Sequence, residues 1–461
     1  MKQKLNQLLK YVQHGTAEGD HRFLKTAFIE NSDWTSINET EPGDFKIITG
    51  NKGVGKSAIL RQIRAVCEAK SIPCLYLTPT DFFYEKEITS TDLGSLNRYY
   101  YSVIENTTRN LLEVSPKPVS LSTKIALVTT KSPIVDIAPE EPATLTEQYY
   151  LLFDDIDHIT NSGNSSQLNK IWGFLLAIRK YVENNPGVTI FIALRTSVWI
   201  RMTTESQGQR DQTDHFRGSI ITISSSDLHN KTIVRKRLDL AALAINTPVP
   251  DSYDLFFDSI RLMIPNTSKD SYRLWEDFIV TNSRERPRDS LQLLKGLVDS
   301  AIKRRANVIS AVDADNALPI YSLERVDDVY NEYSIDCKNI REVILTFIDI
   351  QFVVEFRDLL KHLKIIPSTG STVVRGKILN PNSESDALLI LGLLHEIGFI
   401  NPRVIDENKS RGFDHVTFEK NPYFTKDTNK GELFNSTWEI HPAFRPFLKK
   451  EKEKAYKPFK I

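Results

Sequence analysis

Cysteine is scarce in this chain of 461 residues, which contains three: Cys67, Cys74 and Cys337. Their spacing fits neither a metal-binding pattern nor a disulfide framework, and such cysteine usage is typical of a reducing compartment. No apolar run approaches the roughly 20 residues of a membrane-spanning helix. The segment Met1–Leu5 also lacks the apolar stretch of a signal peptide. These absences predict a cytoplasmic protein without a membrane segment.

An excess of charge of one sign is absent as well. Lys and Arg total 59 and Asp and Glu total 59, so no overall basic field indicates nucleic-acid binding, and any basic surface must be local. The His residues are dispersed, and no Ser/His/Asp or Cys/His set stands out. The sequence therefore contains no nuclease, protease or deaminase constellation, although its length allows about two or three domains.

A glycine-rich segment, Gly50–Ser57, fits the phosphate-binding pattern G-x-x-x-x-G-K-[ST]. Before it, Phe45–Thr49 is short, apolar and β-branched, which predicts a strand; after it, Ser57–Lys70 carries apolar residues at helical spacing. Glycines let the backbone approach an anion and point N–H groups at it, and the start of a helix adds partial positive charge. The segment therefore predicts a P-loop.

Two side chains of this loop have expected roles toward ATP and Mg²⁺. Lys56 can reach the β- and γ-phosphates, and the Ser57 hydroxyl can hold the metal. The expected nucleotide-binding residues are Gly50, Asn51, Lys52, Gly53, Val54, Gly55, Lys56, Ser57 and Ala58.

A second motif, Leu151–Asp157, is an apolar strand that ends in acids. Such a strand places carboxylates at the carboxyl edge of the sheet, where ligands sit in open α/β folds. We expect Asp154 to hold Mg²⁺, directly or through water, and Asp155 to polarise the attacking water. The alternative is a solvated acidic loop after a strand.

Strand-like runs alternate with helical stretches over residues 45–245, which predicts an α/β core with a parallel sheet and helices on both faces. The long gap between the two motifs leaves room for a further strand, as an additional-strand P-loop NTPase requires. Residues 114–147 are rich in Ser, Thr, Pro and Lys and are expected to form an insertion on the core surface.

Outside this core, the sequence predicts helical segments and one α+β domain. Residues 1–44 are expected to be helical and to pack on the core, either near the adenine or without a ligand role. Residues 246–334, with no strand run before 310, are expected to form a helical lid. Residues 335–448 are expected to form an α+β, winged-helix-like domain, and 449–461 a Lys-rich tail.

Four arginines have open roles. Arg195 ends a strong strand and can either sense the γ-phosphate or form a structural salt bridge. Arg288 follows Pro287, which suits the first turn of a helix, and can either reach the phosphates or lie on the surface. Arg210 and Arg217 can either act on the nucleotide of a neighbouring subunit or be solvated.

With these motifs the chain resembles P-loop ATPases of the AAA+/STAND kind, and more narrowly bacterial ATPases found in mobile-element and phage-defence loci. The segments that carry the resemblance are Gly50–Ser57, Leu151–Asp157, Ile192–Ser197, Arg286–Ser290, Leu394–Ile400 and Trp438–Pro442. The resemblance implies a lid with Arg288 as sensor 2 and a C-terminal winged helix. Asp155 departs from the usual Glu, and Arg195 from the usual sensor-1 Asn or Thr, which makes Thr196 the alternative sensor.

Two functions are consistent with this sequence. The first is a Mg²⁺-dependent ATPase that acts as a switch or motor on double-stranded DNA or on a partner effector protein. DNA binding would place residues 388–395 in the major groove, although this run is so apolar that a core position also explains it. The second is a nucleotide-binding homo-oligomeric scaffold that sequesters or presents a toxic effector without significant turnover. In a defence system the toxic activity is then expected on another chain.

Overall fold

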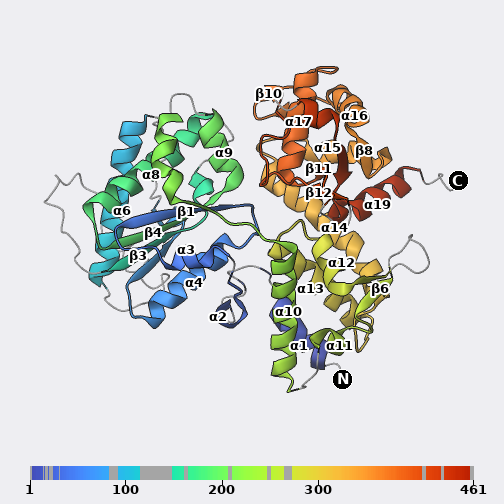
Figure 1. The fold of residues 1–461 in the computed structure, drawn as a ribbon, viewed down its shortest axis with the longest axis horizontal. Helices are drawn as coiled ribbons and strands as arrows, with labels where there is room; N and C mark the ends of the chain where they lie inside the picture. The colour runs from blue at the N-terminus through green and yellow to red at the C-terminus, as the bar shows by residue number, and fades with distance from the viewer. Residues whose placement is uncertain are drawn as a thin grey trace. The chain divides into compact units, whose positions relative to one another are not determined.

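The computed structural model describes residues 3–13, 15, 19, 24–30, 32–82, 92–114, 148–159, 165–205, 210–246, 251–263, 272–407, 412–426 and 430–456. They belong to two compact units (Figure 1). The sheet unit is Leu24–Ser224, and the mixed unit comprises Met1–Phe23 with Ser225–Ile461. Residues 115–147 of the expected insertion and 457–461 of the expected tail lie outside the described residues. None of the described helices is long and apolar enough to cross a membrane.

The sheet unit is built on five strands in the order β2-β3-β4-β1-β5. Every neighbouring pair is parallel. The strands are β1 Asp44–Gly50, β2 Cys74–Leu77, β3 Tyr149–Phe153, β4 Val188–Arg195 and β5 Ile220–Thr222. Because β4 lies between β1 and β3, the sheet has the additional-strand arrangement. The predicted α/β P-loop NTPase fold is confirmed.

Helices cover both faces of this sheet, as Figure 1 shows for α4 and α8. Successive side chains of a strand point to opposite faces, so Ile47 and Ile190 pack under α6 and α8 while Ile48 and Phe191 pack under α3 and α4. The strands are therefore apolar on both faces, as expected of a buried parallel sheet. The helices are α2 Leu24–Ala27, α3 Trp34–Asn38, α4 Lys56–Ala69, α5 Pro79–Phe82, α6 Leu93–Val114, α8 Ser165–Asn184, α9 Thr196–Glu205 and the 3-10 segments Ile156–Ile159 (η1) and Arg210–Ser219 (η2).

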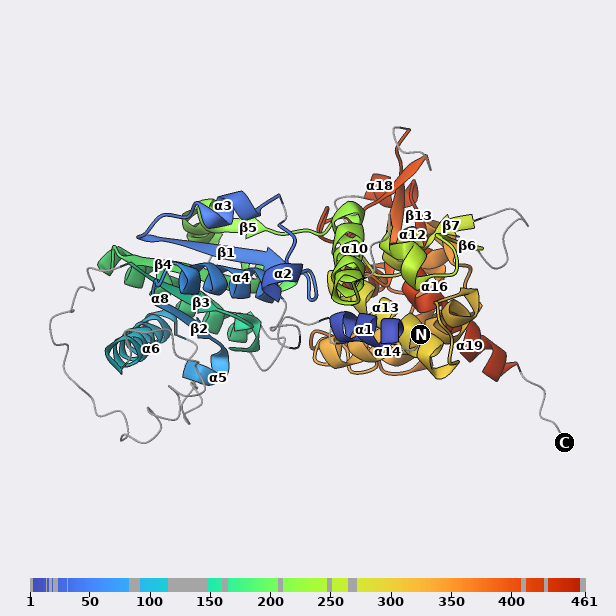
Figure 2. The same cartoon turned by 90° about the horizontal axis from the view of Figure 1, so that it is seen from below.

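The mixed unit begins with the N-terminal helix. Figure 2 shows α1 (Gln3–Val12) beside α10 (Asp227–Ala244) and α13 (Pro287–Lys303). The apolar side of α1 is buried in the same cluster as Val234 and Leu238 of α10 and Leu297 of α13. The division of the chain thus differs from the expected one: α1 belongs with the mixed unit rather than with the sheet, and α10 does as well.

The expected lid is helical but also contains a hairpin. Its helices are α11 Ser252–Phe256, α12 Trp275–Thr281, α13 and α14 Ala311–Tyr333. The sequence shows no strand run here, yet β6 (Arg261–Met263) pairs with β7 (Tyr272–Leu274). These strands are too short to leave a periodic signal in the sequence.

The C-terminal part, expected to be an α+β domain, combines helices with a four-stranded antiparallel sheet of order β12-β11-β13-β8. The strands are β8 Val353–Glu355, β11 Ile400–Ile405, β12 Phe413–His415 and β13 Thr437–Ile440, with a small hairpin of β9 Val373–Val374 and β10 Lys377–Ile378. The helices are α15 Ile340–Leu345, α16 Phe356–Thr369, α17 Glu384–Ile397, α18 Lys430–Phe434, α19 Arg445–Ala455 and the 3-10 segments Thr346–Asp349 (η3) and Pro442–Phe444 (η5).

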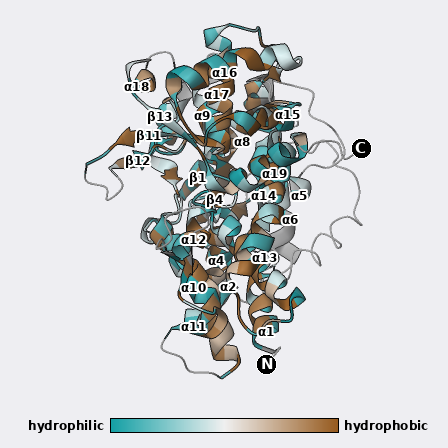
Figure 3. Cartoon of the chain, turned by 90° about the vertical axis from the view of Figure 1, so that its right-hand side faces the viewer, coloured by the Kyte–Doolittle hydropathy of each residue, from teal (hydrophilic) through white to brown (hydrophobic). Residues whose placement is uncertain are grey.

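Helix α17 is a core element, as its apolar colouring in Figure 3 suggests. Leu391, Leu394 and His395 are 0% exposed. Placing residues 388–395 in a DNA major groove is therefore wrong for this conformation, because the side chains that would read bases are packed inside the unit. Gly398 ends the helix in the left-handed region, with φ of 74°, which turns the chain into β11.

Candidate functional site

The loop between β1 and α4 has the backbone of an anion cradle. Gly53 and Gly55 have φ of 83° and 115°, a region that favours glycine. A Cβ on Gly50 would lie 2.8 Å from Val54 Cγ1 and 2.9 Å from Ile223 Cγ1, so close packing excludes a side chain there. By contrast, a Cβ on Gly55 would meet none of the described atoms within 4 Å. The loop is thus packed against the protein at Gly50 and open at Gly55.

Helix α4 begins directly at this opening. Gly55 is its N-cap and has no side chain, so the first N–H groups of the helix have no capping side chain from that residue. Lys56, the first helical residue, folds over the loop and donates from Nζ to Gly50 O at 2.7 Å and to Asn51 O at 3.0 Å. Backbone N–H groups, a helix start and an ammonium group therefore converge, which fits a phosphate.

The carboxylates after β3 differ in exposure. Asp154 is 2% exposed, and its backbone N–H donates to Leu77 O at 2.9 Å. Its Oδ2 accepts the hydroxyl proton of Tyr76, and its Oδ1 accepts the backbone N–H of Asp155 at 3.0 Å. Asp155 is exposed and has a φ of 54°, a conformation uncommon for residues other than glycine. A buried, oriented carboxylate thus precedes an exposed one.

The strand register brings these parts to one edge of the sheet. Gly50 pairs with Arg195, and Phe153 pairs with Ile192, so β1, β3 and β4 end close together. The predicted residues Lys56, Asp154, Asp155 and Arg195 therefore all lie at the carboxyl edge, where open α/β sheets bind ligands. Arg288 lies in the mixed unit, and its reach toward a nucleotide stays a prediction.

A magnesium ion fits the donors of this edge. No group of three or more His, Cys, Asp or Glu among the described residues could hold a metal. Mg²⁺, however, usually binds one or two protein oxygens together with substrate phosphates and water. The hydroxyl of Ser57, at the start of α4, and the carboxylate of Asp154 are such donors.

At the end of β4 the structure favours a structural role for Arg195 and leaves Thr196 available. Arg195 Nε lies 2.6 Å from Asp157 Oδ2, an ion pair between β4 and η1. Thr196 begins α9, and its buried Oγ1 has no hydrogen-bond partner among the described residues. A buried hydroxyl without a partner costs about 1–3 kcal/mol, so this atom is a candidate contact for a ligand or water.

Tyr76 contacts the acidic strand end, and the sequence did not reveal this contact. Tyr76 lies on β2, and nothing in the sequence of Cys74–Leu77 indicates which residue its hydroxyl meets. One signal was present: a buried tyrosine usually finds a hydrogen-bond partner for its hydroxyl, and the sequence predicts an acidic strand end in the same sheet.

The start of α13 carries the predicted lid motif. Pro287 occupies the first turn, as expected, and Arg288 is half-buried with an Nε that has no partner among the described residues. Asp289 pairs with Arg284 at 2.8 Å and with Arg325 at 2.6 Å. Burial alone would raise the pKa of Asp289, but the two guanidinium groups outweigh it and lower the pKa to about 2. The turn before α13 is thus fixed by a buried ion-pair network.

Of the two arginines before β5, Arg217 has the exposure of a surface residue. The side chain of Arg217 is 77% exposed and lies 3.0 Å from Asp214, which agrees with simple solvation. The side chain of Arg210 lies outside the described part of the chain.

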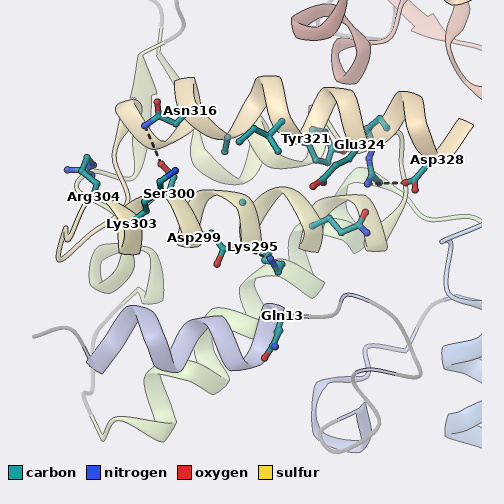
Figure 4. Close-up of a pocket in the computed structure, with 15 residues that line it drawn as sticks. Gln13, Lys295, Asp299, Ser300, Lys303, Arg304, Asn316, Tyr321, Glu324 and Asp328 are labelled. Carbon is teal, nitrogen blue, oxygen red and sulfur yellow. Dashed lines mark hydrogen bonds and ion pairs between the residues drawn. The ribbon is translucent and has the colours of Figure 1, made fainter. Parts of the chain in front are cut away.

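A groove of about 800 Å³, lined mostly by polar and charged residues, lies along α13 and α14 in the mixed unit (Figure 4). Its charges pair with one another: Lys295 Nζ lies 2.6 Å from Asp299, and Arg325 lies 3.0 Å from Asp328. Cations and carboxylates nearly balance in its lining. The groove therefore offers an anion much less than the phosphate loop does.

Comparisons with known proteins give structural similarity alone. No family model and no curated protein matches the chain. Similar solved structures include the Aeropyrum pernix ORC2 protein in ADPNP–ADP complexes, with 10% identity over 95% of this chain and 94% of that chain at a TM-score of 0.38. Domain III of the Thermotoga maritima replication initiation protein DnaA gives 13% identity over 64% and 96%, at 0.33. The Thermotoga maritima RuvB Holliday junction branch migration motor gives 10% identity over 70% and 80%, at 0.31. At these values the fold assignment rests on the strand order and loop geometry of the chain itself.

Proposed function

We propose that the chain is a Mg²⁺-dependent ATPase of the AAA+ type that acts as a nucleotide-driven switch. The observation that supports this most is the meeting of the phosphate loop and the acidic strand end at one edge of the sheet. Lys56 lies over the loop, and the buried Asp154 is held beside the exposed Asp155.

Each residue of this edge has a distinct part in the proposed reaction. Backbone N–H groups of the loop and Lys56 bind and neutralise the phosphates. Ser57 and Asp154 would hold Mg²⁺, which supplies charge neutralisation to the phosphates when bound. Asp155 orients the attacking water, and Thr196 contacts the γ-phosphate. Arg195, paired with Asp157 at 2.6 Å, fixes the loop after β3 rather than touching the nucleotide.

The mixed unit would report the nucleotide state. Arg288 stands at the start of α13, next to the buried pairs of Asp289 with Arg284 and Arg325. We propose that Arg288 contacts the phosphates when ATP is bound and releases them after hydrolysis. Because the turn behind Arg288 is rigidly paired, such a movement would carry α13 with it.

The C-terminal part of the mixed unit would receive this signal as a winged-helix-like module. Base readout in the major groove needs polar side chains that reach base edges, but α17 presents only Ser385 and Leu389 as exposed residues. We therefore propose an effector protein, rather than double-stranded DNA, as its partner. The setting in a bacterial phage-defence or mobile-element system rests on motif resemblance alone, and gene neighbourhood tests it.

One observation favours the alternative of a homo-oligomeric scaffold with little turnover. The proposed water-orienting residue is an Asp whose backbone is held at a φ of 54°. A shorter side chain on a constrained backbone has less reach toward an attacking water than Glu would have. Binding without hydrolysis, together with a nucleotide-dependent mass in light scattering, would favour this alternative.

The test of the proposed function is ATP binding and turnover in three variants. Lys56→Ala is expected to lose nucleotide binding. Asp155→Asn is expected to bind ATP but to hydrolyse it about 10²–10⁴-fold more slowly, the range for loss of a general base. Lys46→Ala is the control, because Lys46 lies on β1 and pairs with Asp44 at 2.8 Å. Normal hydrolysis by Asp155→Asn would refute the assignment of Asp155.

A further inference from the structure

We infer that Tyr76 is a positioning residue that orients Asp154 for Mg²⁺, and this inference rests on the proposed function. Tyr76 is on β2, which pairs in parallel with β3, and its Cα partner there is Leu152. Its side chain is in the cluster under α4, and the residue is 7% exposed. From this position its hydroxyl reaches along the strand and donates to Asp154 Oδ2.

The two donors to Asp154 fix both oxygens of the carboxylate. Tyr76 holds Oδ2, and the backbone N–H of Asp155 holds Oδ1 at 3.0 Å. An ionised carboxylate has about four acceptor positions, so two protein donors leave others for a metal or its water. Because Asp154 is 2% exposed, the loss of one donor would leave a buried charge less stabilised and free to rotate.

Arg61 links this tyrosine to the helix that carries the other proposed metal donor. The guanidinium of Arg61 lies 5.0 Å from the centroid of the Tyr76 ring. Arg61 and Ser57 are four residues apart on α4 and therefore lie on one face of the helix. The helix that places the Ser57 hydroxyl thus also holds the ring that orients Asp154.

This arrangement predicts an effect on metal choice. Mg²⁺ demands near-ideal octahedral geometry, whereas Ca²⁺ accepts flexible coordination. A rotating Asp154 should therefore weaken the response to Mg²⁺ more than the response to Ca²⁺. A role of Tyr76 in packing alone would not produce this difference between the two ions.

The test measures binding of a fluorescent ADP analogue to the full chain while Mg²⁺ or Ca²⁺ is titrated. Tyr76→Phe keeps the ring and removes the hydroxyl. We expect the affinity of this variant for the analogue without metal to stay within about twofold of wild type. The Mg²⁺ concentration that gives half of the metal-dependent change in affinity should rise by about 10–100-fold, the range for loss of an outer-sphere partner. The Ca²⁺ response should shift less.

Tyr149→Phe is the matched control. Tyr149 is a buried tyrosine on β3 whose hydroxyl lies 3.1 Å from that of Tyr181 rather than near Asp154. Its Mg²⁺ response should equal that of wild type. If Tyr76→Phe does not fold, Arg61→Ala takes its place: a shift above about threefold toward higher Mg²⁺ supports the inference, and a smaller one overturns it.

The outcomes separate this inference from the function on which it rests. A wild-type chain that binds the analogue with a clear Mg²⁺ response, and a Tyr76→Phe variant with the same response, would overturn the role of Tyr76 alone. A wild-type chain without nucleotide binding or without any Mg²⁺ response would overturn the proposed function and this inference together.

Discussion

The phosphate loop and the turn before α13 both contain two residues at positive φ, but the residue types differ. The loop places Gly53 and Gly55 at positive φ, whereas the turn places Arg284 and Glu285 there, at 50° and 54°. The glycines leave open space at Gly55. The turn instead fills its surroundings, since Arg284 pairs with Asp289 at 2.8 Å. The first region thus leaves space beside its backbone, whereas the arginine of the second is paired within the protein.

The largest expected effect is that of a substitution at Asp289, which pairs with Arg284 of the turn. Asp289→Asn would leave Arg284 and Arg325 buried beside a neutral group, and we expect a loss of about 3–5 kcal/mol in the free energy of unfolding of the mixed unit. Denaturant unfolding measures this loss. Asp327→Asn is the control, because its partner Arg341, at 2.6 Å, and its own side chain are partly exposed, at 38% and 46%. That variant should lose less than about 1 kcal/mol.

The same ion pair gives an acid dependence. The pKa of Asp289 falls from 3.8 to about 2 on folding. The ionised carboxylate therefore contributes fully to the free energy of unfolding above pH 3.8, and this contribution is lost as pH falls through about 2. Asp289→Asn should lack this part of the acid transition. An unchanged acid profile in the variant would mean that other carboxylates control it.

Gly55→Ala tests whether the open space at Gly55 in the phosphate loop is needed for nucleotide binding. A Cβ at a φ of 115° is strained, at a cost on the order of 1–3 kcal/mol, and it enters the cradle where a phosphate would bind. We expect nucleotide affinity to fall about 100-fold, which corresponds to about 2.7 kcal/mol. Gly94→Ala is the control, because among the described atoms a Cβ there meets only Asp92 Oδ2, at 3.5 Å. Calorimetric titration with ADP measures both variants.

Glu285→Gln has the smallest expected effect. It measures how much the half-buried charge of Glu285 destabilises the folded state. Burial raises the pKa of Glu285 from 4.5 to about 7, against the lowering effect of Lys420. The protonated carboxyl group therefore contributes fully to the stability of the folded state below pH 4.5, and this contribution is lost as pH rises through about 7. Because the residue is half-buried, solvent screening keeps the expected gain of the variant at pH 8 on the order of 1 kcal/mol.

Thermal unfolding between pH 5 and 8 measures that gain. The variant should lose less stability than wild type over this range, and Glu324→Gln, at an exposed position of α14, should not differ from wild type. Equal pH profiles for Glu285→Gln and wild type would show that the charge of Glu285 is not a cost to the turn.

Local signals made the sheet unit largely predictable from the sequence. The loop, its strand and its helix lie within Asp44–Ala69, so composition and spacing defined them together. The acidic strand end was equally local. Their meeting at one edge follows from parallel strand order, and β4 between β1 and β3 confirms the additional-strand expectation.

Pairings between distant residues could not be predicted in the same way. Arg195 had two open roles, and only the fold shows that Asp157 lies 2.6 Å away. Tyr76 and Asp154 are likewise joined by strand neighbourhood rather than by spacing. Residues 1–44 are expected from the sequence to pack on the core, but the partners of α1 are α10 and α13.

The position of α1 also sets an order of events during synthesis. Its partners α10 and α13 follow the whole of Leu24–Ser224 in the chain. At about 5–20 residues per second, translation of that stretch takes on the order of 10–40 s. The apolar face of α1 must therefore wait, exposed, while the sheet unit is made and can fold. Nascent α1 thus keeps an apolar face uncovered until α10 and α13 are made, and early release of the chain would leave it without these partners.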